Sequence, residues 1–278
     1  MSETPHPRAV LARWGLRPQK RYGQHFLVDS AVAVAAARLC VDGDPAIPVL
    51  EIGAGTGMLT SALLEQGANV TAIDIDAALL ATLRERDDVR GARFERGDAL
   101  EFDYAAWAAQ RTWRAAGNLP YNIATPLILR LLELPEGPRT MTFMIQKDVA
   151  LRLNAKAGSA SYGSLSVAVQ YAAHVEYGFS VGPSAFYPRP KVQSAVVRLI
   201  RRDEPAVRPR DLELFRKVVR GAFAYRRKTL VNSLSLALGL PHERLERAAA
   251  AAGIPTERRG ERLELDDFSR LADALAEG

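Results

Sequence analysis

The sequence predicts an α/β fold, a parallel sheet covered by helices, followed by a small all-α domain. Two observations predict it. From residue 49 onward, short apolar runs of β-strand type alternate with longer runs of helical periodicity. Near residue 203 this alternation ends in the polar, proline-containing stretch "RRDEPAVRPRD", and only helical patterns follow. We therefore expect one domain at residues 1–202 and a second at 203–278.

The expected strands are short and mostly apolar. They cover residues 48–53, 69–74, 92–98, 112–119 and 139–146. Helical patterns lie between or after them at 57–67, 76–86, 125–134 and 148–156. Two further strand-like runs, 171–179 and 194–200, are expected to form an antiparallel pair at one edge. In the second domain we expect helices at 211–237, 242–252 and 266–276.

The charge of the chain is uneven. Its 37 Lys and Arg exceed its 32 Asp and Glu, giving a net charge of +5. The stretch 198–230 holds eleven basic and four acidic residues, and residues 1–30 hold five basic and two acidic ones. Two basic blocks are typical of a protein that binds the phosphate backbone of nucleic acid, and a solvated surface is the alternative.

Several function classes are disfavoured by composition. The single cysteine, Cys40, excludes an intramolecular disulfide, and its Ala-rich surroundings favour a buried structural thiol. The four histidines are far apart and show no ligand spacing, so we expect no metal. Neither a membrane-spanning apolar run nor the apolar core of a signal peptide is present, which favours a cytoplasmic protein.

A glycine-rich turn follows the first strand of the sheet in "EIGAGTGMLT". Gly53, Gly55 and Gly57 form GxGxG, so the third glycine comes one residue earlier than in the dinucleotide fingerprint GxGxxG. The second strand ends in Asp74, which can accept hydrogen bonds from both hydroxyls of a ribose. The third ends in Asp98, which can accept a hydrogen bond from an adenine amine. This arrangement favours S-adenosylmethionine (AdoMet) over NAD, and a tight turn without a ligand is the remaining alternative.

The stretch "NLPY" follows the fourth expected strand. The side-chain oxygen of Asn118 and the backbone carbonyl of Leu119 could each accept a proton of an aromatic amine, directing its lone pair toward a methyl donor. Pro120 would fix the carbonyl before it, and Tyr121 could stack on the base. In "SAFYPRPKVQS", Phe186 could cover the other face of a flipped base. For the first stretch the alternative is a rigid loop with a packed tyrosine, and for the second it is a proline-rich connection with an aromatic plug.

Taken in order, these segments resemble the KsgA/RsmA family of ribosomal RNA small-subunit adenine N6,N6-dimethyltransferases. The resemblance covers nearly the whole chain and is carried by "KRYGQHFLVD", "VLEIGAGTGMLT", "AIDID", "GDAL", "GNLPYNIATPLI", "FMIQKDVALRL", "SYGSLSV", "FYPRPKVQSAVVRL" and "FAYRRKTLVNSL". It implies a Rossmann-like class I AdoMet-dependent methyltransferase domain with a small helical C-terminal domain. The implied activity is dimethylation of two adjacent adenosines in a hairpin loop near the 3′ end of 16S rRNA, during small-subunit assembly.

The resemblance also implies which residues form the site. The expected AdoMet contacts are His25, Leu27, Gly53, Gly55, Asp74, Ile75, Asp98, Ala99 and Asn118. The expected catalytic residues are Asn118, Leu119, Pro120, Tyr121 and Phe186. Two positions depart from the family pattern: His25 stands where many relatives have Asn, which affects a side-chain contact only, and Ala54 stands where many have Pro.

Basic residues of the second domain are the expected RNA contacts. On a helical wheel Arg216, Arg220 and Arg227 share one face of the helix expected at 211–237. Our candidates for contact with phosphates are Arg220, Arg226, Arg227 and Lys228. We expect a monomer whose partner is 16S rRNA in the small subunit or its precursor.

Three other functions remain open at the level of sequence. A methyltransferase of the same superfamily could act on large-subunit rRNA, although the "FAYRRKTLVNSL" segment favours the small-subunit type. A methylase fold could also serve as a scaffold, in a ribosome-assembly checkpoint or a mitochondrial-type transcription factor. An NAD-dependent oxidoreductase is the least favoured alternative.

Overall fold

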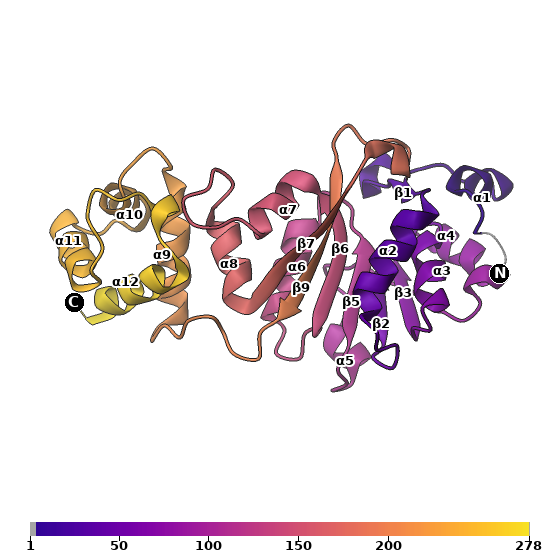
Figure 1. Cartoon of the computed structure of the whole chain (residues 1–278), viewed down its shortest axis with the longest axis horizontal. Helices are drawn as coiled ribbons and strands as arrows, with labels where there is room; N and C mark the ends of the chain where they lie inside the picture. The colour runs from indigo at the N-terminus through magenta and orange to yellow at the C-terminus, as the bar shows by residue number, and fades with distance from the viewer. Residues whose placement is uncertain (1–3, 278) are drawn as a thin grey trace. The chain divides into compact units, whose positions relative to one another are not determined.

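The computed structural model describes residues 4–277, which form two compact units. The first unit contains the chain up to Ala150 together with Val175–Arg201, and the second contains Leu151–His174 together with the chain from Arg202 onward (Figure 1). The second unit therefore includes Leu151–His174, which the sequence analysis placed in the first domain. In residues 4–277 no helix has the length and apolar character needed to cross a membrane.

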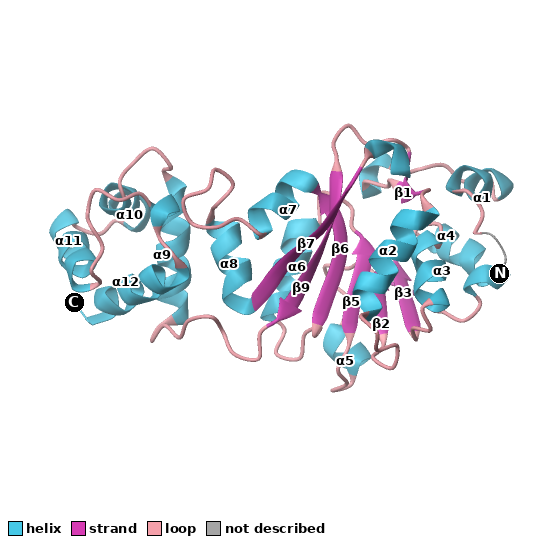
Figure 2. Cartoon of the chain, viewed as in Figure 1, coloured by secondary structure: helices cyan, strands magenta, loops and turns pink. Residues whose placement is uncertain are grey.

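The first unit is built on a seven-stranded sheet of order β4-β3-β2-β5-β6-β9-β7 (Figure 2). The strands β2 (Val49–Ile52), β3 (Val70–Asp74), β4 (Arg93–Arg96), β5 (Arg114–Asn118) and β6 (Thr140–Gln146) are parallel, which confirms the α/β prediction. β9 (Ser194–Arg201) runs antiparallel to β6, and β7 (Ala173–Val181) lies beyond it at the edge. The two late strand-like runs are therefore neighbours, as expected.

Helices cover this sheet and explain why its central strands are apolar on both faces. They are α2 (Ser30–Val41), α3 (Met58–Glu65), α4 (Ala77–Arg84) and α6 (Ala124–Glu133). The short helix α5 (Tyr104–Ala108) lies between β4 and β5 in the chain, and α7 (Lys147–Leu153) follows β6 and continues into the second unit. α2 and α3 share one hydrophobic core with β2 and β3. Cys40 lies in this core with no exposed surface, and burial raises the pKa of its thiol to about 12. The expectation of a buried thiol is confirmed.

Short elements near the N-terminus attach to the edge of the sheet that carries the strand C-termini. They are α1 (Pro7–Arg13), the 3₁₀ turn η1 (Lys20–Tyr22) and β1 (Phe26–Leu27). β1 pairs antiparallel with β8 (Phe186–Tyr187), so residues separated by 159 and 161 positions come together here (27↔186 and 26↔187). α1 packs through Leu11 against Phe26 and Leu79. No pattern in the sequence predicted these short elements.

The second unit is a helical bundle with its own core. Its helices are α8 (Ser164–Ala172), α9 (Leu212–Ala224), α10 (Leu230–Leu238), α11 (His242–Ala251) and α12 (Leu265–Glu277). Leu151–His174 belongs to this unit because Ala155, Tyr162 and Val167 are buried in the same core as Phe215 of α9. The segment supplies apolar side chains to the bundle, which its sequence alone did not reveal.

The helix expected over residues 211–237 is in fact two helices. α9 ends at Ala224, residues 225–229 form a loop, and α10 begins after Thr229, whose side-chain oxygen accepts a hydrogen bond from the backbone N–H of Asn232. The hydroxyl of Ser233 on α10 donates to the carbonyl of Gly221 at 2.6 Å, which fixes the bend. The helical-wheel prediction was therefore wrong for Arg227, which lies in the loop and not on the face of Arg220.

Candidate active site

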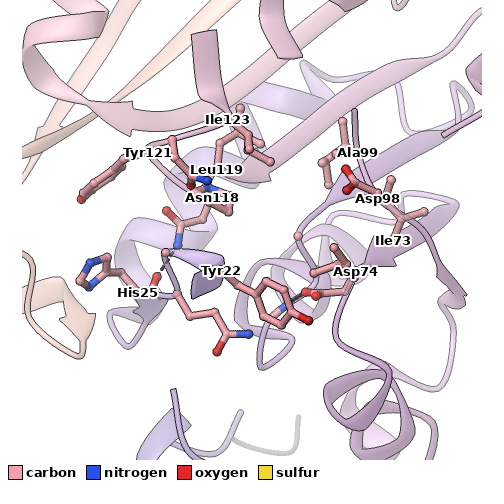
Figure 3. A pocket seen from close by; sticks show the side chains of 18 of the residues that line it. Tyr22, His25, Ile73, Asp74, Asp98, Ala99, Asn118, Leu119, Tyr121 and Ile123 are labelled. Atoms are coloured by element: carbon pink, nitrogen blue, oxygen red, sulfur yellow. Dashed lines mark hydrogen bonds between the residues drawn. The ribbon is translucent and has the colours of Figure 1, made fainter. Parts of the chain in front are cut away.

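A cavity of about 270 Å³ opens at the C-terminal edge of the parallel strands (Figure 3). Its walls come from the residues that end or directly follow the strands: Ile52, Gly53, Ile73, Asp74, Gly97, Asp98, Ala99, Asn118 and Leu119. Ligands of open α/β sheets bind at this edge. We call the part beside Asp74 and Asp98 the acidic end, and the part formed by residues 118–121 with His25 the amide end; Figure 3 shows them on opposite sides.

The glycine-rich turn forms one wall of the cavity because its backbone adopts positive φ angles, which favour glycine. Gly53, Gly55 and Gly57 have φ values of +82°, +53° and +80°. A Cβ on Gly55 would lie 3.1 Å from the ring of Phe26, and one on Gly57 would lie 2.7 Å from the side chain of Leu83. The turn thus passes close to its neighbours and leaves the cavity open.

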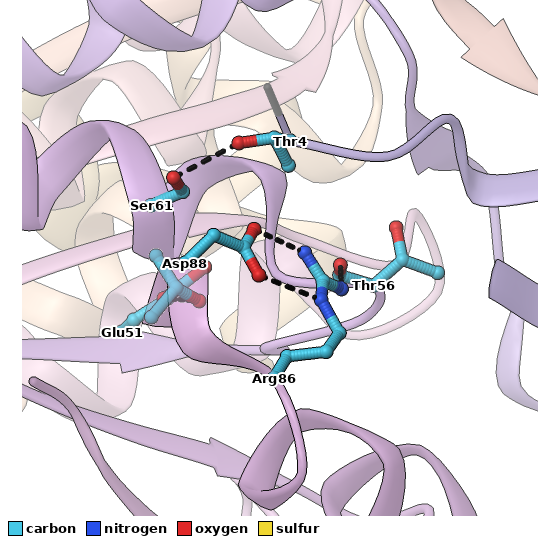
Figure 4. A network of polar contacts seen from close by, with 7 residues as sticks. Thr4, Glu51, Thr56, Ser61, Arg86 and Asp88 are labelled. Atoms are coloured by element: carbon cyan, nitrogen blue, oxygen red, sulfur yellow. Dashed lines mark hydrogen bonds and ion pairs between the residues drawn. The ribbon is translucent and has the colours of Figure 1, made fainter. Parts of the chain in front are cut away.

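An ion pair beneath the same turn holds it from the other side (Figure 4). Arg86 binds both carboxylate oxygens of Asp88, at 2.9 and 2.5 Å, and also donates to the carbonyl of Thr56 at 2.5 Å. Both side chains of the pair are about one-tenth exposed, so water screens the contact weakly. The sequence analysis did not identify this support.

Asp74 lies at the acidic end, held by backbone donors. Its carboxylate accepts from the N–H of Gly55 and from the N–H of Asp76, each at 2.9 Å. Burial raises the pKa of this carboxyl, and the two N–H groups act against that rise. Each carboxylate oxygen accepts one of these bonds, and because each has a second lone pair, acceptor capacity remains for ligand hydroxyls. Asp98 lines the same end and accepts from the N–H of Leu100 at 2.8 Å.

Glu51 is a second buried acid, which the sequence analysis did not single out. It is 1 % exposed on β2 and accepts from the hydroxyl of Thr60 on α3 at 2.6 Å. Burial raises the pKa of this carboxyl to about 8. A charged residue in the apolar run "PVLEIG" was the available signal.

The amide end is fixed by contacts between distant segments. The side-chain N–H of Asn118 donates to the backbone carbonyl of His25 at 2.7 Å. Because the amide nitrogen is used here, the side-chain oxygen is left as an acceptor for a ligand. The N–H of Leu119 donates to the carbonyl of Met144 at 3.0 Å, so the loop is also anchored to β6. Pro120 follows directly and restricts the backbone at Leu119.

The aromatic ring of Tyr121 has a partner in the structure. The ring of His25 stacks on it with 5.6 Å between centroids and 25° between planes. His25 Nδ1 lies 2.7 Å from the carbonyl of Pro188, so this nitrogen carries the proton and donates. The hydroxyl of Tyr121 bonds to that of Ser194 at 2.9 Å, and burial raises the pKa of the tyrosine.

Two of the predicted site residues do not face the cavity. Phe186 and Leu27 are each 4 % exposed and pack in the hydrophobic core, and their backbones pair across β1 and β8. In this structure Phe186 is not placed to stack on a ligand, because its ring is buried in the hydrophobic core. The remaining predicted residues of the site, His25, Gly53, Gly55, Asp74, Ile75, Asp98, Ala99, Asn118, Leu119, Pro120 and Tyr121, all line the cavity.

Residues 19–25 form a strap along the cavity. No pattern in the sequence predicted this strap as a structural element. The side chains of Gln19 and Gln24 both donate to one carboxylate oxygen of Asp76, at 2.9 and 3.2 Å. A Cβ on Gly23 would lie 3.1 Å from the side chain of Asn122, so the strap also passes close to the amide end. Tyr22 lines the cavity beneath it (Figure 3). The signal available was "KRYGQHFLVD", quoted above only for its resemblance.

The predicted RNA contacts all lie in the second unit. Arg220 is exposed on α9, and Arg226, Arg227 and Lys228 are exposed in the loop after it. Arg226 donates to the carbonyl of Ala160 at 3.1 Å and lies 3.7 Å from the carboxylate of Glu261. Within residues 4–277 no group of three or more His, Cys, Asp or Glu could hold a metal ion.

Comparisons with known proteins agree with this geometry. The chain is 40 % identical over 270 residues to "Ribosomal RNA small subunit methyltransferase A" of Desulfitobacterium hafniense (strain DSM 10664 / DCB-2), covering 97 % of this chain and 96 % of the relative. It is 41 % identical over 263 residues to the protein of the same name from Pseudomonas savastanoi pv. phaseolicola (strain 1448A / Race 6), covering 94 % and 96 %.

Solved structures show the same fold. One is the 23S rRNA methyltransferase ErmE, with a TM-score of 0.70 at 28 % identity over 90 % of this chain and 99 % of that one. Another is a dimethyladenosine transferase from Plasmodium falciparum, with a TM-score of 0.72 at 24 % identity over 89 % and 96 %. Residues 15–277 match the model of the family "Ribosomal RNA adenine dimethylase". The chain belongs to the ribosomal RNA adenine dimethylase family and is an AdoMet-dependent rRNA adenine dimethyltransferase.

Proposed function

We propose that this enzyme dimethylates the 6-amino groups of two adjacent adenosines in the 3′-terminal hairpin loop of 16S rRNA, during small-subunit assembly. The observation that carries the proposal is the orientation of the Asn118 amide by the carbonyl of His25 at one end of the cavity. At the other end lies Asp74, a carboxylate suited to the ribose of a nucleoside. The curated relatives, at 40 and 41 % identity, are named as small-subunit methyltransferases, which supports the choice of RNA.

The residues of the acidic end fit AdoMet. Asp74 is held by two backbone N–H groups with acceptor capacity left for the ribose hydroxyls. The exposed side chain of Ile75 and the small side chain of Ala99 line the cavity where a flat purine could lie, with Asp98 beside them to accept from its amine. Gly53 and Gly55 leave room for the rest of the molecule. When bound, AdoMet supplies an electrophilic methyl group.

The amide end prepares the target amine. The lone pair of an aromatic amine is delocalised into the ring, which makes the nitrogen a weak nucleophile. The side-chain oxygen of Asn118 and the carbonyl of Leu119 accept one amine proton each, which favours a pyramidal nitrogen with its lone pair directed at the methyl donor. No strong general base is required, because the nitrogen becomes acidic once it is methylated. The chain thus contributes positioning and polarisation.

Stacking of the target base is assigned to the exposed side of the Tyr121–His25 pair. The tyrosine is held through its hydroxyl by Ser194, and the histidine is held through Nδ1 by the carbonyl of Pro188. Two rings fixed in this way offer a rigid surface to a flat base without loss of side-chain entropy on binding. Phe186 would reach the base only after leaving the core, so we do not include it in the mechanism.

Recognition of the RNA outside the cavity is assigned to the second unit. The exposed Arg220, Arg227 and Lys228 are suited to phosphate contacts, which position an RNA without reading its sequence. Arg226 is partly engaged by Glu261 and contributes less. We propose that the enzyme acts as a monomer on the small subunit or its precursor in the cytoplasm.

A second candidate substrate is adenine in large-subunit RNA. The likeness to the 23S rRNA methyltransferase ErmE favours it, since the two chains align over 90 % of this one. Primer extension across both rRNAs in a deletion strain distinguishes the two. We expect two adjacent stops near the 3′ end of 16S rRNA to disappear and return on complementation. Loss of stops only in large-subunit RNA would contradict the proposal.

A further inference from the structure

The segment from Arg8 to Arg21 carries positive charge without an ion-pair partner among residues 4–277. It contains Arg8, Arg13, Arg17, Lys20 and Arg21, and no Asp or Glu occurs between residues 4 and 28. All five side chains are exposed. Among the residues that the structure describes, none of the five forms an ion pair with a carboxylate. Elsewhere in the first unit, Arg86, Arg90 and Arg198 do form ion pairs with carboxylates.

An exposed tryptophan lies in the middle of this segment. Trp14 is 40 % exposed at the end of α1, whereas Trp113 is 1 % exposed in the core. Trp14 is held in this position by α1, because the buried side chains of Val10 and Leu11 pack this helix against the rest of the unit. An exposed indole among unpaired cations has the two features of a single-strand RNA contact: a flat face for a base and positive charges for phosphates.

The segment leads directly into the wall of the cavity. Arg21 and Tyr22 line the cavity, seven and eight residues after Trp14, and the Arg21 guanidinium lies 4.6 Å from the centre of the Tyr22 ring. Nucleotides flanking an adenosine held at the amide end would meet this part of the rim. The chain between Trp14 and Arg21 also includes two exposed cations, Arg17 and Lys20.

We propose that residues 8–21 form an RNA-contact surface at the cavity rim, with Trp14 stacking on an unpaired base beside the target adenosine. Arg13, Arg17 and Lys20 contact the phosphates that flank this base. The inference rests on the proposed rRNA methylation and adds to it the contact that holds the loop near the cavity. It is separate from the contacts assigned to Arg220, Arg227 and Lys228, which lie in the other unit.

The test compares wild type and variants in the methylation of small ribosomal subunits, which are purified from a strain that lacks the enzyme. Trp14→Ala is expected to raise KM for the subunits about ten-fold, the usual loss for one stacked base, with kcat within about two-fold of wild type. Trp14→Phe keeps a flat ring and is expected to recover most of the loss. The triple variant R13Q/R17Q/K20Q is expected to lower the slope of log(kcat/KM) against log[salt] by about 2.

Two controls separate RNA contact from damage to the fold. Arg38→Gln removes an exposed cation near the end of α2, which leads to the opposite edge of the sheet, and is expected to behave as wild type. The dissociation constant of AdoMet, measured by calorimetry, is expected to be unchanged in Trp14→Ala. If that constant rises as much as KM for the subunits, Trp14 acts through the fold and the proposal is wrong.

The outcomes also separate this inference from the proposed function. If wild type methylates small subunits while Trp14→Ala and the triple variant match it in KM and salt slope, only the surface is overturned. If the triple variant loses its salt slope but Trp14→Phe is as weak as Trp14→Ala, stacking is overturned. If wild type neither binds nor methylates the subunits, both proposals are overturned.

Discussion

At the acidic end of the cavity, the walls come from turns that directly follow β2, β3 and β4, and backbone N–H groups hold the key carboxylate of Asp74. At the amide end, the contacts join segments far apart in the sequence. His25 contacts Asn118, Tyr121 and Pro188, and Tyr121 also contacts Ser194. The difference indicates that the acidic end depends on local backbone geometry, whereas the amide end depends on the packing of whole elements.

The largest effect is expected from Asn118→Ala. It removes an acceptor that acts on the amine during methyl transfer, so kcat should fall about 100- to 1,000-fold. AdoMet affinity should change much less, because the acidic end is built independently. Single-turnover methylation of small subunits measures the first quantity and calorimetry the second. Methylation of small subunits by Asn118→Ala at the wild-type rate would contradict the proposed mechanism.

The next largest effect is expected from Asp74→Asn. The amide keeps the size of the side chain but cannot accept through both oxygens, so the dissociation constant of AdoMet should rise about 10- to 100-fold. Asp98→Asn is the matched change at the same end, where one contact is lost, and the rise should be about ten-fold or less. If calorimetry gives the same rise in the dissociation constant for both variants, Asp74 contributes no more to AdoMet binding than Asp98 does.

Glu51 makes the stability of the folded protein depend on pH. Its pKa is raised to about 8 in the folded protein, so the folded state holds a proton that the unfolded state has released between about pH 4.5 and 8. Stability is therefore greatest below this range and falls as the pH rises through it.

Glu51→Gln should remove that loss and keep an acceptor for Thr60. Chemical unfolding should show the variant gaining about 3–4 kcal/mol relative to wild type between pH 5 and pH 8. Thr60→Val, which removes the donor, serves as the comparison and should lower stability at both pH values. A constant difference between wild type and Glu51→Gln across this range would show that Glu51 does not titrate there.

The smallest effect is expected from His25→Asn. The backbone carbonyl that orients Asn118 remains, and only the stack on Tyr121 and the bond to the carbonyl of Pro188 are lost. These contacts are worth about 1 kcal/mol, so KM for the subunits should rise about five-fold while AdoMet affinity stays constant. A loss as large as that of Asn118→Ala would mean that the side chain of His25 takes part in catalysis.

The sequence by itself determined the acidic end and the alternation that builds the sheet. Gly53, Gly55 and Asp74 could be predicted because each depends on a few neighbouring residues: glycine permits the turn, and a carboxylate ends the strand beside it. The same locality explains why the five parallel strands were found within a few residues of their observed bounds.

Only the tertiary structure decided the rest. It paired β1 with β8, which buried Phe186 and placed His25 on Tyr121 instead. The tertiary structure also places Leu151–His174 in the helical unit and divides the helix expected at 211–237 into two helices. These features depend on contacts between residues many positions apart, where burial and hydrogen bonding outweigh local preference. No pattern in a single segment could therefore reveal them.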